Sequence, residues 1–252
     1  MTLAKIATGD GVPVAFVHGF TQTARTWLPV IDALDFDLSA TLIDAPGHGD
    51  STDGKRTLIE AASDIANSMN RGALVGYSMG ARMALHTALM HPEKVTSLVL
   101  ISGTAGIDAE SERLSRQVSD RSLSERVLSI GVEAFVKEWL RLPMFANLDH
   151  VAANLPERLR NTAQGLADSL NYAGTGMQEP LWDTLSSLEI PVLIIAGAED
   201  QKFVDAAHRL SSLIARSTLC IVPDSGHSVH LEQPVAFATI FRSFIASHQG
   251  EI

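Results

Sequence analysis

Cysteine is almost absent from the 252-residue sequence, which contains only Cys220. A single cysteine cannot form a disulfide within the chain, and its apolar surroundings at residues 217–222 suit a packed strand thiol. No run approaches the roughly 18 consecutive apolar residues of a membrane span, and the first eleven residues lack the apolar segment of a secretory signal. We therefore expect a cytoplasmic protein that has no membrane partner.

Basic residues are also scarce, since 19 Lys and Arg stand against 29 Asp and Glu and the formal net charge is −10. Proteins that bind nucleic acid or an anionic membrane usually carry a basic surface. The composition therefore argues against nucleic acid as a partner, and any anionic ligand must find local positive charge. Hydrophobic residues are plentiful at 46% of the chain, which is enough for one large core.

Short apolar runs alternate along the chain with stretches that have apolar residues at helical spacing. The runs have the length and flanks of buried parallel strands, and they cover residues 14–17, 40–43, 73–75, 95–101, 192–196 and 219–222. The helical stretches are residues 58–69, 79–91, 204–214 and 235–247. This alternation predicts an α/β fold, a mostly parallel sheet with helices on both faces.

Residues 104–187 interrupt this alternation, because they are charged and helix-like and contain no convincing strand. They lie between two of the predicted core strands. We therefore predict a single domain over residues 1–252, with a core of residues 1–103 and 188–252 and a helical lid at residues 104–187.

The sequence Gly76-Tyr77-Ser78-Met79-Gly80 has the pattern G-x-S-x-G between a predicted strand and a predicted helix. This strand-turn-helix context is that of a nucleophile elbow, whose sharp turn leaves no room for flanking side chains and raises the serine hydroxyl above the sheet edge. A glycine-rich turn with a capping serine is the simpler alternative. The context favours the elbow, and with it the α/β-hydrolase fold with Ser78 as the reactive residue.

Ser78 needs a neighbouring imidazole, because a serine hydroxyl is a poor nucleophile or base at neutral pH. His227 lies just beyond the last predicted strand, where its loop is expected to face the elbow. Asp200 follows the predicted strand at residues 192–196 and satisfies the chain order Ser, Asp, His. We predict a catalytic triad of these three residues. Weaker alternatives are Glu199 for the acid and His48 and His230 for the base.

An anionic intermediate needs backbone donors, and the loop His18-Gly19-Phe20 after the first strong strand is expected to face the elbow. We assign the amides of Phe20 and Met79 to an oxyanion hole. This chemistry uses no metal and no cofactor, and we expect neither. A serine at position 78 also excludes the haloalkane dehalogenases and epoxide hydrolases of this fold, which use an aspartate there.

From residue 18 to the C-terminal helix, the chain resembles the 2-succinyl-6-hydroxy-2,4-cyclohexadiene-1-carboxylate (SHCHC) synthases of menaquinone biosynthesis. At the elbow, that family has an aromatic residue before the serine and an arginine four residues after it, here Tyr77 and Arg82. Residues 113–121 resemble the family's R-Q-x-S-D-R stretch, whose arginine falls at Arg116. Trp139 begins a match to a W-x3-P-x-F segment, and Arg160 stands at the place of a third arginine.

The resemblance implies that Tyr77, Arg82, Arg116, Trp139 and Arg160 bind a small substrate with several carboxylates. Arginine forks bind such groups bidentately. Each lid arginine also has a simpler interpretation. Glu112 and Arg116 have the spacing of a helix ion pair, and Glu157 could partner Arg160 at the surface.

The reaction implied by the resemblance is the elimination of pyruvate from 2-succinyl-5-enolpyruvyl-6-hydroxy-3-cyclohexene-1-carboxylate, with Ser78 as the base. Two alternatives stay open. A carboxylic-ester or carbon-carbon bond hydrolase would use the same triad through an acyl-enzyme, and a binding module would close the lid over a ligand without chemistry. The sequence does not indicate an oligomeric state.

Overall fold

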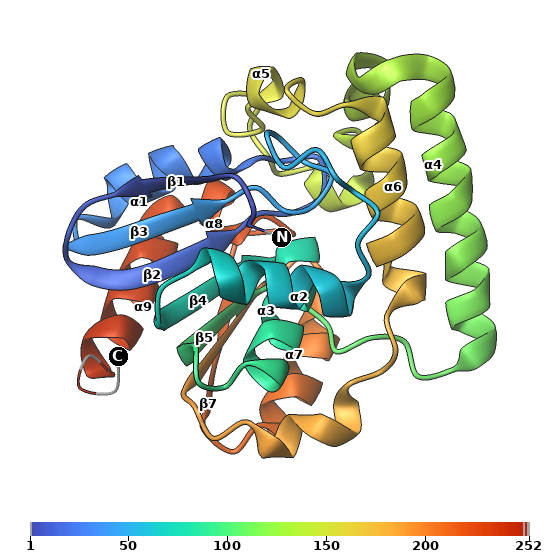
Figure 1. Ribbon diagram of the computed structural model, residues 1–252. Coiled ribbons are helices and arrows are strands. Elements are labelled where there is room, and N and C mark those ends of the chain that lie inside the picture. Colours follow the sequence, from blue (N-terminus) through green and yellow to red (C-terminus); the bar gives the residue numbers. More distant parts are fainter. Residues whose placement is uncertain (1, 249, 251–252) are drawn as a thin grey trace.

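The computed structural model describes residues 2–248 and 250, and its centre is a seven-stranded sheet in the order β1-β3-β2-β4-β5-β6-β7 (Figure 1). Neighbouring strands are parallel except for β1 and β3. The strands are β1 (Lys5–Thr8), β2 (Val12–Val17), β3 (Leu38–Ile43), β4 (Gly72–Tyr77), β5 (Val95–Ile101), β6 (Val192–Gly197) and β7 (Ser217–Val222). The predicted mostly parallel sheet is confirmed.

The sequence patterns missed the edge strand β1, which has only four residues and a mostly exposed side-chain pattern. Such a strand lacks the apolar run that marks a buried parallel strand. They also missed the short helix α1 (Leu28–Leu34).

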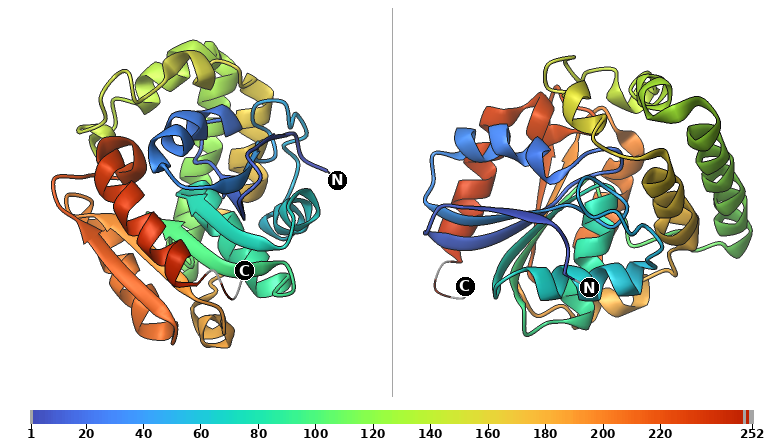
Figure 2. Two further views of the ribbon diagram at one scale, coloured as in Figure 1. Left: turned by 90° about the vertical axis from the view of Figure 1, so that its left-hand side faces the viewer. Right: turned by 45° about the horizontal axis from the view of Figure 1, so that its top comes forward.

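Helices cover both faces of the sheet, as predicted (Figure 2). On one face lie α1 and α9 (Pro234–Ser247), and on the other lie α2 (Leu58–Ser68), α3 (Met79–Met90) and α7 (Gln201–Leu213). The short helix α8 (Val229–Glu232) precedes α9. Successive strand residues face opposite sides, so Phe16 packs in the α1–α9 layer and Val17 in the α2–α3–α7 layer. This two-sided burial explains the continuous apolar strands.

The segment between β5 and β6 is helical and forms a separate layer beside the sheet (Figures 1 and 2). Its longest helices, α4 (Glu110–Trp139) and α6 (Ala163–Ala173), pack against each other. Its shorter elements are η2 (Pro143–Phe145), α5 (Leu155–Arg158), η3 (Thr175–Met177) and η4 (Trp182–Ser187). Val127, Phe135 and Leu166 form a small apolar core within this layer. A left-handed residue in α4, Gly131 with φ 79°, divides that helix into two arms.

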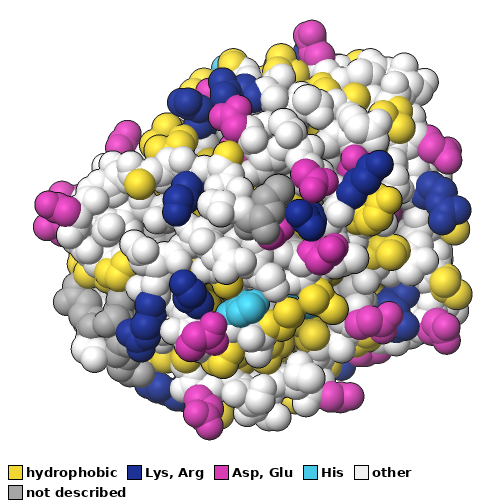
Figure 3. Space-filling view, viewed as in Figure 1, with side chains coloured by type: hydrophobic (Ala, Val, Ile, Leu, Met, Phe, Trp, Pro, Cys, Tyr) yellow, Lys and Arg dark blue, Asp and Glu magenta, His cyan; other side chains and the backbone are white. Residues whose placement is uncertain are grey.

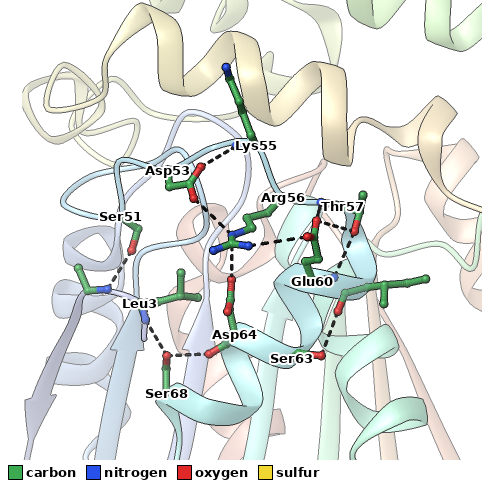
Figure 4. A network of polar contacts seen from close by, with 12 residues as sticks. Leu3, Ser51, Asp53, Lys55, Arg56, Thr57, Glu60, Ser63, Asp64 and Ser68 are labelled. Carbon is green, nitrogen blue, oxygen red and sulfur yellow. Dashed lines mark hydrogen bonds and ion pairs between the residues drawn. The ribbon is translucent and has the colours of Figure 1, made fainter. Parts of the chain in front are cut away.

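A polar network joins the loop after β3 to the start of α2 (Figure 4). Thr57 caps α2 in a capping box, in which its hydroxyl accepts from the Glu60 amide and the Glu60 carboxylate accepts from the Thr57 amide. Arg56 forms ion pairs with Asp53, Glu60 and the buried Asp64. Because α2 packs against α3, these contacts support the helix that begins next to Ser78.

Acidic and basic side chains are interspersed on the face of the molecule in Figure 3. Within residues 2–248 and 250, no helix combines the length and apolar content needed to cross a membrane.

Candidate active site

Ser78 occupies the sharp turn between β4 and α3, where its backbone has φ 52° and ψ −106°. This conformation is unfavourable for a residue other than glycine, and such strain is typical of a nucleophile elbow. The flanking glycines are needed for space. A Cβ atom at Gly76 would lie 2.4 Å from the Gly80 carbonyl oxygen, and one at Gly80 would lie 2.2 Å from the Val17 carbonyl oxygen.

Ser78, His227 and Asp200 come together from three different loops. The Oγ of Ser78 lies 2.8 Å from Nε2 of His227, and Nδ1 of His227 lies 2.7 Å from Oδ2 of Asp200. The imidazole is 1% exposed and packs against the Phe203 ring at a centroid distance of 4.6 Å. Both distances are those of direct hydrogen bonds, so the arrangement can move a proton from the hydroxyl to the imidazole.

The alternative residues for the triad have other partners. The carboxylate of Glu199 accepts a hydrogen bond from Asn147 at 2.6 Å and is exposed. His48 accepts a hydrogen bond from the Thr21 amide, and His230 packs between the rings of Trp27 and Tyr77. None of the three is therefore placed to replace Asp200 or His227.

A cavity of about 870 Å³ lies between Ser78 and the helical layer. Its walls include Phe20 from the loop after β2, Met79 from the start of α3, and Trp139 from α4. The Trp139 ring contacts the Phe20 ring at a centroid distance of 5.1 Å, and its Nε1 has no hydrogen-bond partner among the described residues. Phe20, Met79 and Trp139 therefore give the cavity apolar walls near Ser78.

Arg82 lines this cavity, and its side chain is only 6% exposed. Its guanidinium donates to the carbonyl oxygens of Ala173 at 3.0 Å and Gly174 at 3.4 Å, and it forms no ion pair with any carboxylate of the described residues. Burial and the nearby charge of Arg116 lower the pKa of Arg82 to about 10, so it remains a cation at neutral pH. A buried cation without a carboxylate is costly, and an anionic ligand would compensate for it.

Arg116 also lines the cavity, and its Nε donates to the buried Asp120 at 2.7 Å. The helix partner is therefore Asp120 rather than Glu112. The second carboxylate oxygen of Asp120 accepts from the Gly176 amide at 3.1 Å, which fixes the carboxylate and orients the guanidinium. Arg82 and Arg116 thus place two cations in the wall of the same cavity.

Arg160 and Tyr77, which the resemblance singled out, do not line the cavity. Arg160 lies at the surface, with its side chain 40% exposed and in ion pairs with Asp50 at 3.5 Å and Glu157 at 3.6 Å. The simpler interpretation of Arg160 is the correct one in this structure.

Tyr77 is 3% exposed, and its hydroxyl lies 2.6 Å from Oγ of Ser228. As the last residue of β4, it packs in the α1–α9 layer, where its ring lies behind the His227 imidazole at 5.4 Å. The expected contact of Tyr77 with a substrate is therefore wrong for this structure, because the pleat of the strand directs the ring away from the cavity.

The sequence patterns missed two further cations in the cavity wall, Lys202 and Arg209 of α7. Arg209 forms an ion pair with Asp108 and stacks over the Trp182 ring at 3.8 Å. Lys202 follows Asp200 by two residues, so the rule that ligands bind beyond the carboxyl ends of parallel strands could have indicated it.

Comparison with known proteins places this site in a family. Residues 14–240 match the alpha/beta hydrolase family. A Bacillus subtilis (strain 168) protein, provisionally named 2-succinyl-6-hydroxy-2,4-cyclohexadiene-1-carboxylate synthase, is 37% identical over 93% of this chain and 90% of its own length. The enzyme of that name from Serratia proteamaculans (strain 568) is 30% identical over 92% of each chain.

Among solved structures, MenH from S. aureus superposes with a TM-score of 0.88 at 30% identity, over 99% of this chain and all of that chain. A thermophilic esterase from Thermogutta terrifontis, with malate bound, has a TM-score of 0.85 over 98% of this chain and 94% of its own, at 24% identity. The esterase shares the fold alone. The chain belongs to the alpha/beta hydrolase family and, within it, to the group of the SHCHC synthases.

Proposed function

We propose that the protein is an SHCHC synthase, a lyase of menaquinone biosynthesis that eliminates pyruvate from 2-succinyl-5-enolpyruvyl-6-hydroxy-3-cyclohexene-1-carboxylate. The observation that carries this proposal is the pair of cavity arginines, Arg82 and Arg116, beside the hydrogen-bonded Ser78. A bound neutral ester would not compensate the charge of a buried guanidinium that has no carboxylate partner, whereas a carboxylate of a polyanionic substrate would.

The proposed base is Ser78, activated by His227. The imidazole accepts the hydroxyl proton, and Asp200 holds Nδ1 so that Nε2 faces the serine. The Ser78 oxygen then removes the ring proton next to the succinyl carbonyl, and the electrons move to that carbonyl oxygen as an enolate. The enolate then reforms the carbonyl, its electrons shift through the ring double bond, and the bond between the ring carbon and the enolpyruvyl oxygen breaks. The imidazolium gives its proton to the departing enolate, which leaves as pyruvate.

The enolate oxygen requires hydrogen-bond donors, for which we propose the amides of Phe20 and Met79. Met79 is the first residue of α3, so its N–H has no acceptor within the helix. The turn at Phe20 is closed by a bond from the Gln22 amide to the Gly19 carbonyl oxygen, which does not use the Phe20 amide. Both residues border the cavity beside Ser78.

Arg82 and Arg116 are the proposed carboxylate partners of the substrate, and Trp139 is the proposed apolar wall for its ring. In this proposal, the segment at residues 104–187 acts as a lid over a small anionic substrate, in the cytoplasm and without nucleic acid or a membrane as partner. Arg82 and Arg116 supply local positive charge in the cavity wall, which reconciles an anionic substrate with a chain of net charge −10.

In the test, the purified protein is given the proposed substrate and the pyruvate it releases is measured. Lactate dehydrogenase reduces this pyruvate, and the NADH consumed reports the rate. Ser78→Ala should lower the rate at least about 10³-fold but leave binding intact, because the arginines remain. Arg82→Ala and Arg116→Ala should each lower kcat/KM about 10- to 100-fold, the value of a hydrogen bond to a charged group.

A neutral nitrophenyl ester is the matched control substrate, since an ester hydrolase would use the same triad. Its hydrolysis should change less than about threefold in the arginine variants, because it has no carboxylate to lose. Equal losses on both substrates would refute the role of the arginines. Ester turnover without any pyruvate release would favour the hydrolase instead.

A further inference from the structure

Thr21 is held by hydrogen bonds at each of its three polar atoms. Its amide donates to Nε2 of His48 at 3.3 Å, its carbonyl oxygen accepts from Nδ2 of Asn161 at 2.7 Å, and its hydroxyl oxygen accepts from the Arg158 guanidinium. The residue is fully buried and has φ 68°. A β-branched residue is strained in this left-handed region, so external contacts must maintain its conformation.

The contact from His48 is that of a neutral imidazole. Burial is the main cause that lowers the pKa of His48 to about 3, and the neighbouring His18 adds to it. The Nδ1 of His48 lies 3.1 Å from the Pro46 carbonyl oxygen, to which it donates, so Nε2 is the acceptor for Thr21. This side of the loop is therefore anchored by the core.

The other two contacts come from the helical segment. Arg158, the last residue of α5, is 1% exposed, and its Nε donates to the Ala153 carbonyl oxygen at 2.7 Å. It forms no ion pair with a carboxylate in the described part of the chain. Asn161 uses its oxygen to accept from the Gly49 amide at 2.9 Å, so it joins two loops of the core. Neither Arg158 nor Asn161 borders the cavity.

We infer that Arg158 and Asn161 are positioning residues for the oxyanion hole. By holding Thr21, they fix the direction of the Phe20 N–H that precedes it. The turn of the helical segment that carries Arg158 and Asn161 therefore keeps this donor in place for the oxyanion. The inference rests on the proposed use of the Phe20 amide as an oxyanion donor. It also gives the buried Arg158 charge a role that ordinary packing would not require, because burying an unpaired cation is unfavourable.

The test compares variants that remove the hydrogen bond between the Arg158 guanidinium and the Thr21 hydroxyl. Arg158→Met removes the guanidinium that donates this bond, and Thr21→Val removes only the hydroxyl that accepts it. Thr21→Ser keeps the hydroxyl and serves as the conservative rescue. Arg126→Gln, which breaks an ion pair with Glu138 at the exposed surface of α4, is the matched control.

Two rates are measured for each variant: pyruvate release, and the phosphonylation of Ser78 by an alkyl fluorophosphonate. In the second reaction, the Ser78 oxygen displaces fluoride from phosphorus, and the phosphoryl oxygen requires the oxyanion hole. Phosphonylation does not depend on the identity of the substrate.

Arg158→Met and Thr21→Val should lower kcat and the phosphonylation rate by about tenfold or more, which is the scale of a displaced oxyanion donor. KM should stay within about twofold, because Arg82 and Arg116 are untouched. Thr21→Ser and Arg126→Gln should behave like the parent protein.

Phosphonylation at the parental rate in both Arg158→Met and Thr21→Val would overturn the inference, whatever the change in Tm. A parent protein that reacts with the fluorophosphonate but releases no pyruvate would refute the proposed function alone. In that case the relative phosphonylation rates still decide whether Arg158, through Thr21, positions the oxyanion loop.

Discussion

The buried His230 should make the protein less stable in mild acid. It is 2% exposed, and its ring packs between those of Trp27 and Tyr77 at centroid distances of 4.6 and 4.5 Å. Its Nδ1 has no hydrogen-bond partner within the described residues. Burial, together with the charges of His227 and Arg158, lowers the pKa of His230 to about 3, so the folded protein holds this imidazole neutral.

The unfolded chain binds a proton at His230 with the ordinary pKa of about 6.5. Between about pH 3 and pH 6.5 the unfolded state therefore carries more protons, and stability rises with pH. The contribution of neutral His230 is complete above pH 6.5 and is lost as the pH falls toward the folded-state pKa. At pH 5, protonation of the unfolded state lowers the free energy of unfolding by about 2 kcal/mol relative to pH 7.

The assay is urea unfolding of the parent and His230→Phe proteins at pH 7 and pH 5. Phe has no titrating group, so the loss of stability between the two pH values should be smaller by about 2 kcal/mol in the variant. Any packing cost of the new ring is independent of pH and cancels in this comparison. His150→Asn is the control, because His150 is 92% exposed and should leave the loss unchanged. An identical loss in the His230→Phe and parent proteins would refute the reasoning.

Three further changes test the site and its supports. Asp200→Asn should lower kcat by about 10³- to 10⁴-fold with little change in Tm, because the amide no longer holds His227 in the required tautomer; pyruvate release and thermal melting measure this. Gly76→Ala should cost about 1–3 kcal/mol in urea unfolding and also slow turnover, since its Cβ would lie 2.4 Å from a backbone oxygen; parental stability would contradict this. Thr57→Ala should destabilise the protein by about 1 kcal/mol through loss of the α2 cap while kcat stays unchanged.

The sequence alone was sufficient for the features that local spacing controls. The apolar runs and helical periods located six of the seven strands and the parallel arrangement. The turn at Ser78 is marked in the sequence by the two glycines around it, although Gly80 also makes room for Val17 of the neighbouring strand β2. Asp200 and His227 could be placed beside it because the carboxyl ends of parallel strands meet at one edge of a sheet.

The tertiary structure alone decided which long side chains point inward. Arg158 and Arg160 are two residues apart, and a helical turn rotates about 100° per residue, so they leave the chain in roughly opposite directions. Either arginine could have faced the core by sequence. The docking of α5 against Thr21 buries Arg158, whereas Asp50 and Glu157 hold Arg160 at the surface. Side-chain direction at such a corner depends on which surface the turn packs against, and no local pattern in the sequence carries that information.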